Sequence, residues 1–86
     1  MTKGEEVRCI ADYDLFDNQI KNMIGLYIKT DAVTKKHLVY FKDLEEWAEL
    51  SDEQIELVKD NFVSVENQEI ADTIKALHKT FWKLLN

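Results

Sequence analysis

The chain of 86 residues contains no proline and only two glycines, Gly4 and Gly25. Flexible linkers and low-complexity loops are usually rich in these residues, so we expect one domain, residues 1–86, without an internal linker. Apolar residues make up 45% of the chain and charged residues 33%, which is typical of globular proteins. A chain of this length buries roughly 60% of its unfolded surface, enough for one modest core but not for a deep active-site pocket.

Cysteine is also scarce, since Cys9 is the only one and no intramolecular disulfide can form. It lies in "VRCIADY", an alternating segment in which a free cysteine usually acts as a small buried hydrophobe. The N-terminus has no apolar run after its charged residues, and no stretch reaches the roughly 18 apolar residues of a membrane span. We therefore expect a cytoplasmic protein with no membrane partner.

Motifs that support catalysis are missing as well. The chain has no glycine-rich phosphate loop and no G-x-S-x-G sequence, and its only serines are Ser51 and Ser64. The two histidines, His37 and His78, have neither each other nor Cys9 at a spacing typical of metal ligands. We therefore expect no enzymatic activity, no metal and no cofactor.

The net charge of −6 is unevenly distributed, because residues 20–42 carry +4 and residues 43–60 carry −7. One interpretation of the acidic stretch is a solvated outer face that keeps a small domain in solution. The other is a negative surface that meets a host protein with a basic surface, with Trp47 as an apolar anchor. The residues assigned to this partner-binding surface are Asp43, Glu45, Glu46, Trp47, Glu49, Asp52, Glu53 and Glu56.

The basic stretch suggests a different function. Its five lysines are interleaved with aromatic residues, a combination that can contact phosphates and stack on bases. The overall negative charge and the single arginine of the chain argue against nucleic acid as the partner. The candidate nucleic-acid contacts are Lys29, Lys35, Lys36 and Tyr40.

A third possibility is self-association through the C-terminal "FWKLLN". Neighbouring residues on a helix point about 100° apart, so Phe81 and Trp82 cannot both face the same surface. If one packs on the body of the domain, the other is available to a second subunit. A homodimer through Phe81, Trp82 and Leu85 is therefore an alternative.

Periodicity predicts a sheet followed by a helix. Alternation of apolar and polar side chains predicts a strand within residues 5–14. Residues 14–22 are rich in Asp and Asn, which predicts a loop. Residues 23–42 predict a hairpin with lysines at its tip, in which Gly25 permits a bulge or a close backbone approach. Residues 66–86 have an apolar stripe at helical spacing, which predicts an amphipathic helix with Asn67 as the N-cap.

Residues 51–62 fit two structures. In the first, Ser51 and Gln54 form a capping box, and Ile55, Val58 and Phe62 lie on one face of a helix. In the second, "SDEQ" is a single turn between the strand "EWAEL" and the short closing strand "IELV". The sequence leaves both open.

The order of these elements over residues 5–58 resembles a small SH3-like barrel. "EEVRCIADYD" matches the first strand, "DLFDNQ" the long loop, "IGLYIKT" and "HLVYF" the central hairpin, and "EWAELSDEQIELV" the strand, helical turn and closing strand. The aromatic groove of peptide-binding SH3 domains needs clustered aromatic residues on the long loop, where only Tyr13 and Phe16 are present. The resemblance implies an α+β fold, with a small curled antiparallel sheet and a C-terminal amphipathic helix.

A barrel followed by a helix also looks like the compact accessory proteins of phages of Gram-positive bacteria. This resemblance implies a small non-catalytic protein-interaction module from a phage or mobile element. Such a protein would bind a host protein and inhibit or redirect it.

Overall fold

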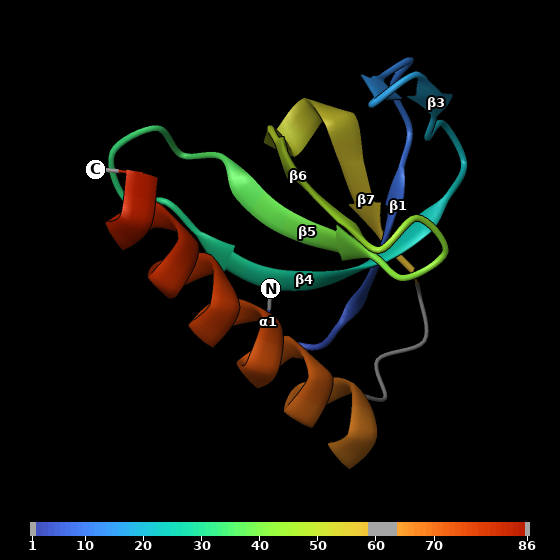
Figure 1. Cartoon of the computed structure of the whole chain (residues 1–86). Coiled ribbons are helices and arrows are strands. Elements are labelled where there is room, and N and C mark those ends of the chain that lie inside the picture. Colours follow the sequence, from blue (N-terminus) through green and yellow to red (C-terminus); the bar gives the residue numbers. More distant parts are fainter. Residues whose placement is uncertain (1, 59–63, 86) are drawn as a thin grey trace.

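The computed structural model describes residues 2–58 and 64–85, with side chains through Leu77. It has a five-stranded antiparallel sheet in the order β6-β5-β4-β1-β7, a two-stranded sheet β2-β3, and one helix at the C-terminal end (Figure 1). The elements are β1 (Glu6–Cys9), β2 (Asp14–Leu15), β3 (Asn18–Gln19), β4 (Ile24–Thr30), β5 (His37–Phe41), β6 (Glu46–Leu50), the 3₁₀ helix η1 (Asp52–Gln54), β7 (Ile55–Leu57) and α1 (Val65–Leu85). The expected α+β class is confirmed. No pairing joins β6 to β7 among the described residues, so the expected barrel is not closed by hydrogen bonds.

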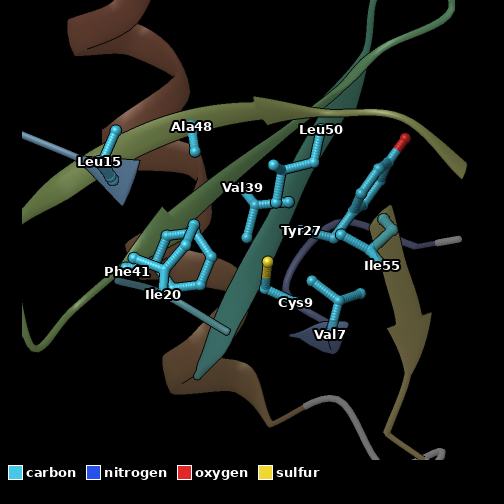
Figure 2. Close-up of a cluster of buried hydrophobic side chains, with 10 residues drawn as sticks. All are labelled: Val7, Cys9, Leu15, Ile20, Tyr27, Val39, Phe41, Ala48, Leu50 and Ile55. Atoms are coloured by element: carbon cyan, nitrogen blue, oxygen red, sulfur yellow. The ribbon is translucent and has the colours of Figure 1, made fainter. Parts of the chain in front are cut away.

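The concave face of the sheet encloses the main hydrophobic core, called here the inner cluster (Figure 2). Alternation in β1 places Val7 and Cys9 on this face, where both are fully buried, as their spacing predicts. Cys9 therefore acts as a packing residue. The members of the inner cluster are Val7, Cys9, Leu15, Ile20, Tyr27, Val39, Phe41, Ala48, Leu50 and Ile55.

The opposite face of the sheet is covered by α1, which packs mainly on β4 (Figure 1). The second core, called here the outer cluster, consists of Leu26, Ile28, Leu38, Ala71 and Ile74. Because β4 is buried on both faces, its sequence is a continuous apolar run instead of an alternating one. The apolar stripe of α1 contacts the sheet through Ala71 and Ile74, whereas Leu77 is 53% exposed.

Gly25 allows β4 and β5 to pack closely. A Cβ atom added there would lie 2.6 Å from Val39 Cγ1, 2.9 Å from the Tyr40 carbonyl oxygen and 3.1 Å from Phe41 Cδ1. The close approach expected for this residue is thus present. The register irregularity of the hairpin lies elsewhere, between Tyr27 and Lys29.

Residues 51–58 adopt the turn-plus-strand structure and not the helix. Ile55 is buried in the inner cluster and pairs with Cys9 of β1. Its side chain therefore projects from a strand of the sheet and not from the face of a helix. Gln54 Oε1 accepts hydrogen bonds from the Ser51 backbone N–H at 2.9 Å and from its hydroxyl at 3.3 Å, which holds the turn. Residues 59–63 lie outside the described part of the chain.

The N-cap predicted for the helix is wrong by one turn. The helix begins at Val65, and Ser64 Oγ accepts a hydrogen bond from the Asn67 N–H at 3.0 Å. Ser64 is therefore the cap, and Asn67 is already inside the first turn. Both residue types cap helices well, so residue type alone does not distinguish them.

Candidate protein-binding surface

The acids of residues 43–53 follow one edge of the five-stranded sheet. Asp43 and Glu45 lie in the turn between β5 and β6, Glu46 and Glu49 on β6, and Asp52 and Glu53 on η1; all six are exposed. We call this set the acidic edge. Because β6 is the last strand of the sheet and is roughly 13 Å long, the carboxylates surround one solvent-exposed border. Glu46 and Glu49, three residues apart on the strand, point to opposite sides of it.

Most of these carboxylates have no cationic partner among the residues that the structure describes. Residues 43–58 contain no lysine or arginine. Within the described residues, Asp52 forms a hydrogen bond with His37 Nε2, and none of the other five acids of the edge forms an ion pair. Among the described residues, their negative charge is therefore not neutralised by an ion pair, and it adds to the electrostatic potential of this border.

The pKa of Tyr40 is affected by burial and by two acids of the acidic edge. Burial raises the pKa of its hydroxyl above the usual value, and the nearby Glu45 and Glu46 carboxylates raise the pKa further. Tyr40 lies opposite Trp47 in the β5–β6 pair, and both side chains are half-buried beside the outer cluster. Trp47, the expected apolar anchor, thus contributes part of its surface to internal packing.

Glu45 adopts a left-handed backbone conformation with φ of 52°. Its N–H donates to the Lys42 carbonyl at 3.2 Å, and the Leu44 N–H donates to the Phe41 carbonyl at 3.2 Å. Glycine or asparagine would adopt this conformation at lower cost. The turn therefore presents a carboxylate at a position where local backbone energetics favour other residues.

Glu56 differs from the acids of the acidic edge in its strand and in its partner. It lies on β7, at the opposite end of the strand order, and its carboxylate pairs with the guanidinium of Arg8 on β1 at 3.3 Å. The sequence grouped it with the other acids because a linear count ignores strand order. Its charge is largely balanced by its neighbour.

The candidate nucleic-acid contacts are spread along the β4–β5 hairpin, with Lys29 on β4. Lys35 and Lys36 are exposed in the turn between β4 and β5, while Tyr40 lies at the other end of β5, beside glutamates. Tyr27 and Phe41, which could have supplied stacking surfaces, are both buried in the inner cluster. Tyr40 is thus separated along β5 from Lys35 and Lys36.

Sequence reasoning missed a polar network around His37, which is buried at the start of β5. His37 Nδ1 lies 2.7 Å from Thr30 Oγ1, which lies 2.5 Å from the Tyr27 hydroxyl, and Nε2 contacts Asp52. A carboxylate can only accept, so Nε2 donates to Asp52 and Nδ1 of a neutral ring accepts from Thr30. The network ties η1 to the β4–β5 hairpin and fixes Asp52 at one end of the acidic edge. The sequence did contain a signal for the burial of His37. In an alternating strand its side chain points to the same face as those of Val39 and Phe41.

A second missed feature is a hairpin in the predicted loop. Strands β2 and β3 enclose a two-residue turn, Phe16 and Asp17, whose φ values are 48° and 66°. Positive φ at both positions characterises the hairpin turns that favour Asn-Gly. A bulky aromatic residue there costs about 1 kcal/mol or more. The Phe16 side chain is nevertheless 70% exposed.

The candidate oligomer contacts, Phe81, Trp82 and Leu85, lie on α1, and their side chains fall outside the described ones. Among the side chains that are described, no group of three or more His, Cys, Asp or Glu residues is arranged to hold a metal ion. The one helix of the described chain is not apolar enough over its length to cross a membrane.

Comparison of the chain with protein-family models, curated proteins and solved structures finds no match.

Proposed function

We propose that this protein is a small non-catalytic interaction module that binds a basic surface of a partner protein through its acidic edge. The observation that carries the proposal is the set of five exposed carboxylates along one sheet border without a cationic partner among the described residues. Like-charged groups so placed repel one another and are stabilised when a basic surface covers them. We expect the chain to come from a phage or mobile element and its partner to be a protein of the host cell.

An SH3-like arrangement of the domain is part of the proposal. Its support is the strand order β6-β5-β4-β1-β7, with a hairpin excursion after β1 and a 3₁₀ turn directly before the last strand. In such an arrangement β6 is a border strand of a curled sheet whose concave face is filled by core side chains. The acidic edge is then a rigid feature of the scaffold.

The mechanism is occupation of the partner's surface. Unneutralised carboxylates increase the association rate with a positively charged surface, and this acceleration weakens as salt screens the charges. Once bound, the protein inhibits or redirects its partner because it covers a surface that another molecule would use. No bond is made or broken.

The test is affinity capture from a nuclease-treated bacterial lysate with two matched variants. Glu46→Lys/Glu49→Lys reverses the acidic edge, and Glu66→Lys/Glu69→Lys reverses two exposed acids on α1 and gives the same net charge. We expect capture of one stoichiometric protein by the wild-type chain and the α1 variant, and its loss with the acidic-edge variant. Equal capture by all three would refute the proposal.

A nuclease-sensitive result points elsewhere. If the captured material disappears with nuclease, and Lys35→Glu/Lys36→Glu abolishes its capture, the exposed lysine turn is the binding site and nucleic acid is the partner. The same set of samples therefore decides between the two surfaces.

A further inference from the structure

The hairpin β2–β3 presents an apolar side chain between two acids. Phe16 is 70% exposed, and Asp14 and Asp17 on the same hairpin are also exposed. Neither acid pairs with a cation within the described residues; the nearby Lys21 pairs with Asp12 at 3.7 Å. The tip is therefore an aromatic ring flanked by unneutralised negative charge.

Local backbone energetics do not explain a phenylalanine at this position. The left-handed turn would accept asparagine or glycine with less strain. With only two glycines in the chain, the other left-handed non-glycine positions of the described chain are Asp17, Asn22, Lys35 and Glu45, whose side chains are all polar. Phe16 alone combines a strained backbone with an exposed apolar ring among the described residues. Such combinations occur where function requires them.

The hairpin backbone is held firmly, so the point from which the Phe16 side chain projects is defined. Leu15 and Ile20 anchor it in the inner cluster (Figure 2). Gln19 Oε1 accepts from the N–H groups of Tyr13 at 2.9 Å and Lys21 at 3.1 Å, and the Asn18 side-chain amide donates to the Phe16 carbonyl at 3.1 Å. A pre-organised backbone reduces the conformational entropy that the hairpin loses on binding.

We propose that Phe16 is the apolar anchor of the partner interface, inserting into an apolar pocket bordered by lysine or arginine side chains of the partner protein. This inference rests on the proposed function and supplies the anchor that the sequence assigned to Trp47. Asp14 and Asp17 complement the basic border of the pocket. The base of the hairpin and β6 belong to the same core, because Leu15 and Ala48 are both members of the inner cluster. Central aromatic residues with a polar surround are typical interface hot spots.

The experiment separates binding from folding. Phe16→Asn places a residue suited to the left-handed turn, so we expect the urea midpoint of unfolding to stay the same or rise. The captured protein, once purified, should bind this variant at least tenfold more weakly by isothermal titration calorimetry, the loss typical of removing an aromatic hot spot. The control is Val33→Ser, at an 88% exposed apolar position in the β4–β5 turn. We expect it to leave affinity unchanged.

Affinity of Phe16→Asn within twofold of wild type would overturn the anchor. If Glu46→Lys/Glu49→Lys still abolishes binding in that case, the acidic edge stands without it. The converse result, with loss of binding only in Phe16→Asn, supports the anchor and refutes the acidic edge. A wild-type chain that captures no protein refutes both.

Discussion

Gly25→Ala tests whether β4 and β5 are as closely packed as the structure shows. The new methyl group would lie 2.6 Å from Val39 Cγ1 and 2.9 Å from the Tyr40 carbonyl oxygen. The backbone oxygen cannot rotate away, so the two strands must separate. Overpacking of this kind costs about 1–3 kcal/mol, and the reduced freedom of the unfolded chain with alanine offsets about 0.5–1 kcal/mol of it.

We therefore expect Gly25→Ala to lower the free energy of unfolding by about 1–2 kcal/mol. For a domain of this size, that loss lowers the melting temperature by about 4–16 °C. Urea unfolding followed by tryptophan fluorescence measures it, and an unchanged m-value shows that the same surface is exposed on unfolding. The control is Ile24→Val, at the adjacent residue, which is 43% exposed; its effect should be well below 1 kcal/mol. A Gly25→Ala protein as stable as wild type would refute the packing argument.

Three further predictions concern hydrogen bonds and charge. Ser64→Ala removes the acceptor of the first helical turn and should lower the free energy of unfolding by about 1 kcal/mol, as measured in urea; no loss would mean that another group caps α1. Tyr27→Phe removes the hydroxyl bonded to Thr30 and should cost about 0.5–1.5 kcal/mol, whereas an unchanged melting temperature would show that this bond contributes nothing. Glu45→Gln should lower the pKa of Tyr40 toward its usual value in a spectrophotometric titration, with Tyr40→Phe identifying the signal. Since the folded state holds the Tyr40 proton more tightly, stability should fall as pH rises above about 10, and a pKa insensitive to Glu45→Gln would contradict the assigned cause.

The structure changes how the acidic stretch is understood. In the sequence, eight residues from 43 to 56 form one uninterrupted candidate surface with Trp47 near its centre. In the fold, Glu56 is paired with Arg8 on the other border of the strand order and Trp47 is half-buried. The remaining acids border β6, and Phe16, the aromatic residue proposed to act with them, comes from a different part of the chain. If both bind one partner, no linear motif describes the surface that they form.

Local sequence patterns predicted much of the secondary structure and part of the core of this protein. Alternation in β1 placed Val7 and Cys9 in the core, β-branched and aromatic runs marked the β4–β5 hairpin, and helical spacing marked α1. Each of these predictions depends on side-chain periodicity within one element, and periodicity is a property of consecutive residues. The scarcity of glycine likewise singled out Gly25, whose role follows from close strand packing.

Only the tertiary structure decided the rest. Ile55 could belong to a helix or to a strand, and the outcome depended on whether β1 was available as a pairing partner. No local sequence pattern gives that information. His37 acquired its role from Asp52, fifteen residues away, and Trp47 lost exposure to a second cluster that also contains residues of α1. Ion pairing and burial depend on which strands become neighbours. The acids of this chain could therefore be counted from the sequence, but those that remain unpaired could be identified only in the fold.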